Sequence, residues 1–272
     1  MIVNHTSELY IKKHWVLENP DKTLLKGANH MIPDGCLEVM FVERGEVIIS
    51  NSRDIERCAL GIYVAYQVSD FVNIALKPLT KVHFVKLFPW VNGIISSTSF
   101  KKIANKVVPL SQINQTLFLR LSNYNLAEEI EVTVRKLCLF ITENVKLYND
   151  FDLIYQSCTK FSSKESDFKK SKKEILSTFK ISSKTLENKF KHTIGLSPKQ
   201  FEIVVRLRAV AEKLKYEKDD CSLTSIAQEF NFFDQAHFIR TFKSFFKLPP
   251  GDIDLDKYFI SDSKEPFRYY TI

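Results

Sequence analysis

The sequence predicts an α+β protein of two domains, a β-rich N-terminal domain with flanking helices and an all-α C-terminal domain. Its 272 residues exceed the roughly 250 beyond which chains divide into domains. Short apolar runs separated by turn residues occupy the first half, whereas apolar residues at three- and four-residue steps occupy the second. The 44% of hydrophobic residues is enough to give each domain a buried core.

Strands are predicted from apolar runs at residues 36–42, 47–49, 61–68, 72–76 and 82–87. Residues 43–46 have the length and the glycine of a hairpin loop between the first two strands. After Pro109 the apolar side chains follow helical spacing, at Leu117, Leu121, Ile130, Val134, Leu137, Ile141 and Val145. We expect a hinge at residues 148–152, which divides the chain into domains 1–149 and 150–251 and leaves the tail 252–272 unassigned.

An internal repeat gives the C-terminal half its architecture. Residues 185–191 and 237–243 share one pattern at an offset of 52, with an apolar residue, then Phe190 or Phe242, then Lys. Each copy continues to a Leu-x-Pro sequence and is preceded by a short apolar helical pattern, at residues 175–179 and 226–230. A helix, a short turn and a second helix, repeated twice, predict two helix-turn-helix units.

The segment between the two copies predicts a single long helix. Ser197 and Pro198 are a favoured N-cap and first helical residue, and helical spacing continues to Lys215. At about 1.5 Å per residue this helix is roughly 27 Å long. A helix of that length suits two recognition helices that enter successive major grooves, about 34 Å apart, on one face of DNA.

The two copies resemble the signature of the AraC/XylS family over residues 150–251. The first motif extends from Ile181 to Lys199 and the second from Ile226 to Lys243. The resemblance implies a bacterial, sequence-specific DNA-binding transcriptional regulator, an activator and not an enzyme, with no cofactor and both recognition helices in successive major grooves of double-stranded DNA. It also implies a homodimer and RNA polymerase as a further partner.

The first half resembles the sensor-type domains that are fused to such modules. The resemblance lies in residues 32–36, 86–90 and 107–110. It implies that this domain binds a small-molecule effector, dimerises, or does both. Tyr63, Phe88 and Trp90 either line the effector pocket or belong to the core.

Several positions depart from the family pattern. Asn188 stands where Arg is usual, Leu176 where a small residue is usual, and Asn231 and Lys247 where Gly is usual. Phe233 occupies the usual N-cap of the second recognition helix, so we expect Asp234 to cap it one residue later. These departures affect base preference and not the fold.

The resemblance places DNA contacts at the front of each recognition helix, while Leu186, Phe190, Phe238 and Phe242 belong to the core. Asn and Gln pair bidentately with adenine, Arg with guanine, and Glu accepts from cytosine. The contacts are Ser183, Lys184, Glu187, Asn188 and Lys191 in the first unit and Gln235, Ala236, His237, Arg240 and Lys243 in the second.

Some of these positions have a second interpretation. Glu187 contacts a base or forms a salt bridge with Lys184 or Lys191, and His237 contacts DNA or is a surface histidine without a role. Four lysines meet either phosphates or solvent. They are Lys189, Lys191, Lys199 and Lys243.

The positive charge is concentrated in the same half. Residues 160–248 contain 19 Lys and Arg against 11 Asp and Glu, a net +8, whereas the rest of the chain carries −1. This asymmetry favours nucleic acid as a partner over a membrane, although a basic surface that is merely solvated gives the same count. Residues 160–250 contain both predicted helical units, so we expect that fragment to fold and bind DNA alone.

Other classes of protein are less consistent with the sequence. No apolar run approaches the roughly 18 residues of a membrane span, and residues 1–14 lack the layout of a secretory signal. The five cysteines are scattered and never form a CxxC pair, which is typical of reduced thiols in the cytoplasm. A metal site at His30, Glu38, Glu43 and His83, or a helix-turn-helix adaptor that has lost DNA binding, are the alternatives.

Overall fold

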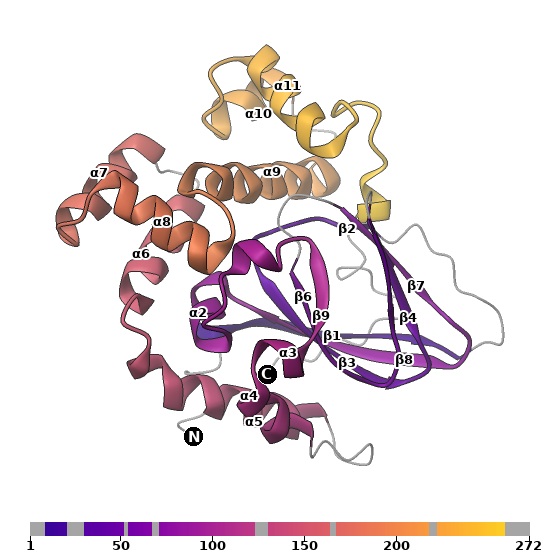
Figure 1. Cartoon of the computed structure of the whole chain (residues 1–272). Coiled ribbons are helices and arrows are strands. Elements are labelled where there is room, and N and C mark those ends of the chain that lie inside the picture. Colours follow the sequence, from indigo (N-terminus) through magenta and orange to yellow (C-terminus); the bar gives the residue numbers. More distant parts are fainter. Residues whose placement is uncertain are drawn as a thin grey trace.

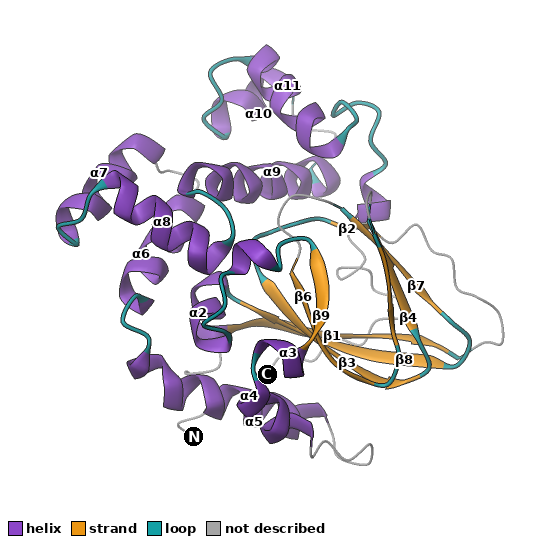
Figure 2. Ribbon diagram, in the orientation of Figure 1, coloured by secondary structure: helices purple, strands orange, loops and turns teal. Residues whose placement is uncertain are grey.

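The computed structural model describes residues 9–20, 30–51, 54–66, 71–122, 130–163, 167–217 and 222–258. The first part of the chain folds into two antiparallel sheets with flanking helices, and everything from residue 151 to the end of the described chain is helical or loop (Figures 1 and 2). The predicted fold class is therefore confirmed. Within the described residues, no helix is both long and apolar enough to cross a membrane.

The two sheets pack face to face around a shared core. Trp15 of one sheet stacks on Phe84 at 4.1 Å between ring centroids, and both belong to one cluster of buried side chains with residues of the other sheet, such as Ile74. The five-stranded sheet has the order β1-β8-β3-β6-β9 and the four-stranded sheet the order β2-β7-β4-β5. The strands are β1 (Ile11–Asn19), β2 (His30–Met31), β3 (Leu37–Arg44), β4 (Val47–Ser50), β5 (Ile55–Cys58), β6 (Gly61–Tyr66), β7 (Val72–Leu76), β8 (Thr80–Leu87) and β9 (Lys106–Pro109).

The five predicted strands are present, although residues 67 and 68 of the third lie outside the described residues, and the predicted hairpin is wrong. Strands β3 and β4 belong to different sheets, so residues 43–46 carry the chain from one sheet to the other. Gly45 takes a φ of 76°, and a Cβ there would lie 2.2 Å from Oγ1 of Thr80. Strand β1 was not predicted because Lys12, Lys13 and His14 interrupt its apolar alternation.

Helices cover the outer face of the five-stranded sheet and form the C-terminal half. The helices are α2 (Asn92–Ile95), α3 (Leu110–Ile113), α4 (Gln115–Ser122), α5 (Ile130–Asn144), α6 (Phe151–Ser162), α7 (Phe168–Thr178), α8 (Ser183–Ile194), α9 (Pro198–Tyr216), α10 (Leu223–Glu229) and α11 (Gln235–Phe246). Short 3-10 helices lie at η1 (Pro89–Val91), η2 (Phe100–Lys102), η3 (Val145–Leu147) and η5 (Leu255–Tyr258). Helix α7 begins earlier than the sequence indicated, because the carboxylate of Asp167 caps it by accepting from the backbone N–H of Lys170.

The long helix α9 joins the two helix-turn-helix units. Figure 1 shows it lying between the β-sheets and the pair α10–α11. Phe201 and Val204, in its first half, belong to the core of the first unit, whereas Leu207 and Val210, further along, belong to the core of the second. Its start is the predicted one: Ser197 and Gln200 form a capping box. One rigid helix therefore fixes both units relative to each other.

The core of the first unit continues into the N-terminal half. Phe190 and Ile194 of α8 share one cluster of buried side chains with Ile95, Phe100 and helix α6. A fragment of residues 160–250 lacks most of α6 and also lacks the buried Leu255 of the second core. Both cores extend beyond the ends of this fragment, and its independent folding stays a prediction.

The start of the tail, which the sequence left unassigned, packs against the second unit. Ile253 and Leu255 are buried in its core. The ring of Tyr258 stacks on His30 of β2, with 4.7 Å between ring centroids. Phe71 of the N-terminal half packs on Phe246 at 5.3 Å, so the second unit also contacts the β-sheets.

A buried ion cluster lies where the sheets meet α9. The carboxylate of Asp34 is 3.1 Å from the ammonium groups of both Lys12 and Lys86, and Lys86 is 3.0 Å from Glu38. The next residue, Gly35, lies so close to the ring of Phe201 that a Cβ there would be 2.6 Å from it. Burial favours the neutral carboxyl, but the lysines outweigh it and hold the pKa of Asp34 well below its usual range.

Candidate nucleic-acid interface

The first recognition helix, α8, is capped at its start and backed by a phenylalanine core. The hydroxyl of Ser182 accepts a hydrogen bond from the backbone N–H of Thr185 at 3.1 Å. Leu186 and Phe190 are fully buried, as predicted, and hold α8 against its neighbours. The helix ends at Gly195, whose φ of 72° is left-handed.

The predicted contacts of α8 lie on its accessible surface. Lys184, Asn188 and Lys191 are exposed, and Ser183 and Glu187 are partly exposed. The carboxylate of Glu187 lies 3.6 Å from Nζ of Lys172 on α7, rather than pairing with either of the lysines that the sequence suggested. An ion pair this exposed contributes little to stability.

The second recognition helix, α11, begins one residue later than the family pattern, as predicted. Asp234 is its N-cap and accepts from the backbone N–H of His237 at 2.6 Å. Phe238 and Phe242 are fully buried, and Gln235, Ala236, Arg240 and Lys243 are exposed.

Two of these side chains have contacts within the protein. The hydroxyl of Thr224 donates to Oε1 of Gln235 at 2.9 Å, which orients that amide. The backbone N–H of Phe233 donates to Nδ1 of His237 at 3.3 Å, so His237 helps to hold the turn before α11.

Left-handed residues stand where the family usually has glycine. Asn231 has a φ of 55° and Lys247 a φ of 62°. Both terminate a helix, which is where a left-handed residue is needed. The turn and helix end are therefore built as in the family pattern, at the cost of backbone strain.

Of the four lysines that the sequence assigned to either phosphates or solvent, two form ion pairs with carboxylates of the protein itself. The ammonium of Lys189 lies 2.6 Å from the carboxylate of Asp150, and that of Lys199 lies 2.8 Å from Glu202. Lys191 and Lys243 are exposed, and neither forms an ion pair with another described residue. The geometry thus favours the last two for phosphate contacts.

The end of α8 is bonded to the N-terminal half. The amide of Asn92 donates to the backbone carbonyl of Thr193 at 3.2 Å, and the hydroxyl of Tyr66 donates to that of Ile194 at 2.5 Å. The Tyr148 hydroxyl is 2.7 Å from that of Thr193. These contacts join residues far apart in sequence, so no local pattern could have indicated them. They fix the orientation of α8.

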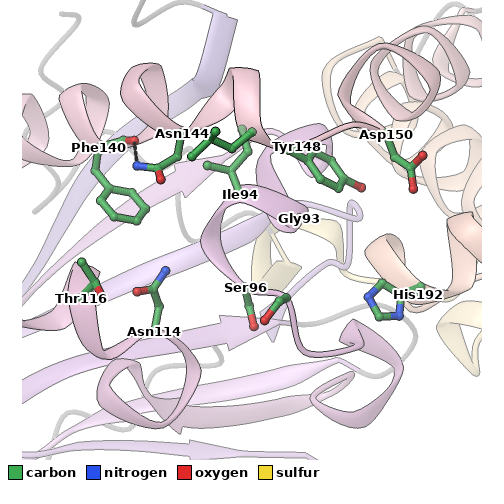
Figure 3. A pocket seen from close by; sticks show the side chains of 12 residues that line it. Gly93, Ile94, Ser96, Asn114, Thr116, Phe140, Asn144, Tyr148, Asp150 and His192 are labelled. Atoms are coloured by element: carbon green, nitrogen blue, oxygen red, sulfur yellow. Dashed lines mark hydrogen bonds between the residues drawn. The ribbon is translucent and has the colours of Figure 1, made fainter.

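A cleft of about 520 Å³ opens beside this junction (Figure 3). Tyr148 forms part of its wall and packs so closely that a Cβ at Gly93 would lie 2.3 Å from its ring. His192, on the last turn of α8, also lines the cleft. The other lining side chains include Ile94, Asn114, Phe140, Asn144 and Asp150.

The aromatic residues that the sequence proposed for a pocket pack elsewhere. Phe88 and Trp90 stack on each other at 4.4 Å, and Trp90 also contacts Tyr155 of α6 at 5.1 Å. Tyr63 packs against the core between the sheets. These rings stabilise the fold, and none of them lines the cleft of Figure 3.

The residues of the alternative metal site do not come together, because they have different partners. Nε2 of His83 is 3.0 Å from Glu43, whereas Glu38 pairs with Lys86 and His30 stacks on Tyr258. Among the described residues, no group of three or more His, Cys, Asp or Glu could hold a metal ion. The four described cysteines are free and buried, and Cys221 lies outside the described residues.

Comparison with known proteins identifies the C-terminal half. Residues 175–254 match the family described as "Helix-turn-helix domain". A comparison with curated protein sequences gives no match.

Several solved structures are similar to this chain at low identity. ToxT of Vibrio cholerae strain SCE256 with a bound unsaturated fatty acid is 14% identical, with a TM-score of 0.44 over 92% of this chain and 96% of that one. ToxT of Vibrio cholerae O395 bound to (E)-4-(8-methylnaphthalen-1-yl)but-3-enoic acid is 13% identical, with a TM-score of 0.42 over 90% and 97%. The AraC-like transcriptional activator CuxR is 12% identical, with a TM-score of 0.28 over 65% and 67%.

The family match and the observed helices agree on the class of this domain. Residues 175–254 form a helix-turn-helix domain, as the repeat predicted. A helix-turn-helix unit is a DNA-binding motif, so the matched residues carry the DNA-binding part of the chain.

Proposed function

We propose that α8 and α11 read specific double-stranded DNA by entering successive major grooves on one face. The observation that carries this proposal is that one helix, α9, belongs to the cores of both units while each recognition helix keeps an exposed polar front. The front of a recognition helix is the part that reaches base edges in helix-turn-helix proteins.

The residue types suggest distinct roles along the two helices. Asn188 offers a bidentate amide for adenine, and Arg240 offers a guanidinium for guanine or phosphate. Lys191 and Lys243 are exposed near the helix ends and suit phosphate contacts. The other proposed contacts are Ser183, Lys184, Glu187, Gln235, Ala236 and His237.

We further propose that residues 1–149 regulate residues 150–251, by binding an effector, by dimerising, or by both. The cleft beside α8 supports the first route, because a volume of about 520 Å³ lies within the range of small-molecule sites. A ligand there would contact both Tyr148, which is bonded to Thr193, and His192 of α8. In this scheme a homodimer on DNA recruits RNA polymerase as an activator.

The DNA-reading roles are tested with two variants on an operator selected from random double-stranded DNA. Asn188→Ala should relax the preference at one or two base pairs, because a bidentate contact discriminates by about 1–3 kcal/mol. Arg240→Ala should weaken binding more, and if Arg240 meets phosphate the salt slope should fall by about one. Fluorescence anisotropy on matched and mismatched DNA measures both.

The control for the loss of a cation is Arg57→Ala, at an exposed arginine on β5. Its affinity should equal that of the parent. If both interface variants bound the operator as tightly and as selectively as the parent, the assignment of α8 and α11 to the grooves would be wrong. An effect of only one variant would mean that a single helix reads DNA.

A further inference from the structure

The turn before α11 holds a large apolar side chain in water. Phe233 is 92% exposed, the highest value among the exposed large hydrophobic side chains of the described chain. Its neighbour Phe232 is buried against Phe238 and the guanidinium of Arg206. Burial of apolar surface drives association. Covering Phe233 by a partner therefore contributes more favourable binding free energy than covering its less exposed neighbours.

The backbone presents Phe233 in a fixed position. The N–H of Phe232 donates to the carbonyl of Ala227 at 2.8 Å, and the N–H of Phe233 donates to Nδ1 of His237 at 3.3 Å. The N-cap bond of Asp234 fixes the next residue. Because the turn is already ordered, little conformational freedom is lost when Phe233 meets a partner.

The position of Phe233 indicates what that partner is. It directly precedes the N-cap of α11, the helix whose first residues Gln235 and Ala236 are also exposed, and the first residues of a recognition helix reach base edges. The exposed cations Arg240 and Lys243 on the same helix favour a polyanion over an apolar protein surface. In the major groove of DNA, the apolar group that a base presents is the C5-methyl of thymine.

We propose that Phe233 packs against the C5-methyl group of a thymine in the α11 half-site and gives a preference for thymine there. This inference rests on the proposed function, since it requires α11 to lie in the major groove. It adds a specificity-determining residue at a position where the family pattern has the N-cap.

The test replaces each thymine of the selected operator by uracil, which removes only the methyl group. At one position in the α11 half-site the parent should lose about fourfold in affinity, the value expected for one buried methyl group. Phe233→Ala should bind the original operator more weakly and show no loss at that position. Phe233→Leu, which keeps an apolar side chain, should retain part of the discrimination.

The matched control is Ile55→Ala, because Ile55 is 68% exposed on β5 and outside the interface. Its uracil profile should equal that of the parent. A Phe233→Ala variant with the full uracil profile of the parent, or an operator with no methyl-sensitive thymine in that half-site, would overturn this inference alone. If the parent selected no DNA at all, the proposed function would fall with it. Unchanged circular dichroism of Phe233→Ala would show that the fold is intact.

Discussion

The affinity of this protein for its operator should fall about a thousandfold between 50 and 200 mM salt. Neutralising roughly six phosphates gives this slope, because each contact releases condensed counterions. The net charge of +8 on residues 160–248 supplies the cations. Lys184, Lys191 and Lys243 are exposed at the recognition helices, in contrast to Lys189, which pairs with Asp150.

Anisotropy titrations at four salt concentrations measure this slope. Lys191→Ala should reduce it by about one, since one phosphate contact is lost. Lys189→Ala is the matched control, because that ammonium is already paired within the protein, and it should leave the slope nearly unchanged. An affinity that hardly varied with salt would rule out the phosphate contacts.

Asp34→Ala should lower the free energy of unfolding by about 3–5 kcal/mol. The substitution breaks the buried ion pair between Asp34 and Lys86, so Glu38 alone compensates the ammonium of Lys86 only in part, and breaking a buried pair is costly. Asp34 also accepts a hydrogen bond from the backbone N–H of Cys36 at 3.0 Å, so its loss should weaken the turn at Gly35, which packs on Phe201 of α9. Urea denaturation monitored by tryptophan fluorescence measures the change.

Two comparisons make this prediction specific. Lys12→Ala should cost about 1 kcal/mol or less, because the Lys12 side chain is 41% exposed and its pairing is screened by water. The pKa of Asp34 is depressed in the folded state, so its contribution is complete above the unfolded pKa of about 3.9 and is lost as pH falls below that value. Parent stability should therefore decline more steeply on acidification than that of Asp34→Ala. Equal stability of Asp34→Ala and parent at neutral pH would contradict the account.

The sequence predicted the C-terminal half well because its repeat is local. The Phe190 and Phe242 positions, the Ser197 cap and the later cap at Asp234 all follow from short spacings, and all are present. These features depend on neighbours within a few residues, which is what a sequence pattern records.

The features that the sequence missed depend on contacts between distant residues. The pairing of β3 with β8 rather than β4, and the bonds of Tyr66 and Tyr148 to the end of α8, join segments separated by tens of residues. Helix spacing and turn composition carry no information about such pairs. The contacts of Tyr148 and Asp150 with α8 are of the same kind, and the hinge expected at residues 148–152 stays a prediction.

The central claim, that both recognition helices lie in successive major grooves, is tested most directly by hydroxyl-radical footprinting on the selected operator. Two helices held by α9 should protect two stretches of backbone about 10 base pairs apart on one face of the DNA. Phosphate contacts flank each groove, so both stretches should be visible at low salt. A single protected stretch, or two stretches on opposite faces, would contradict the account.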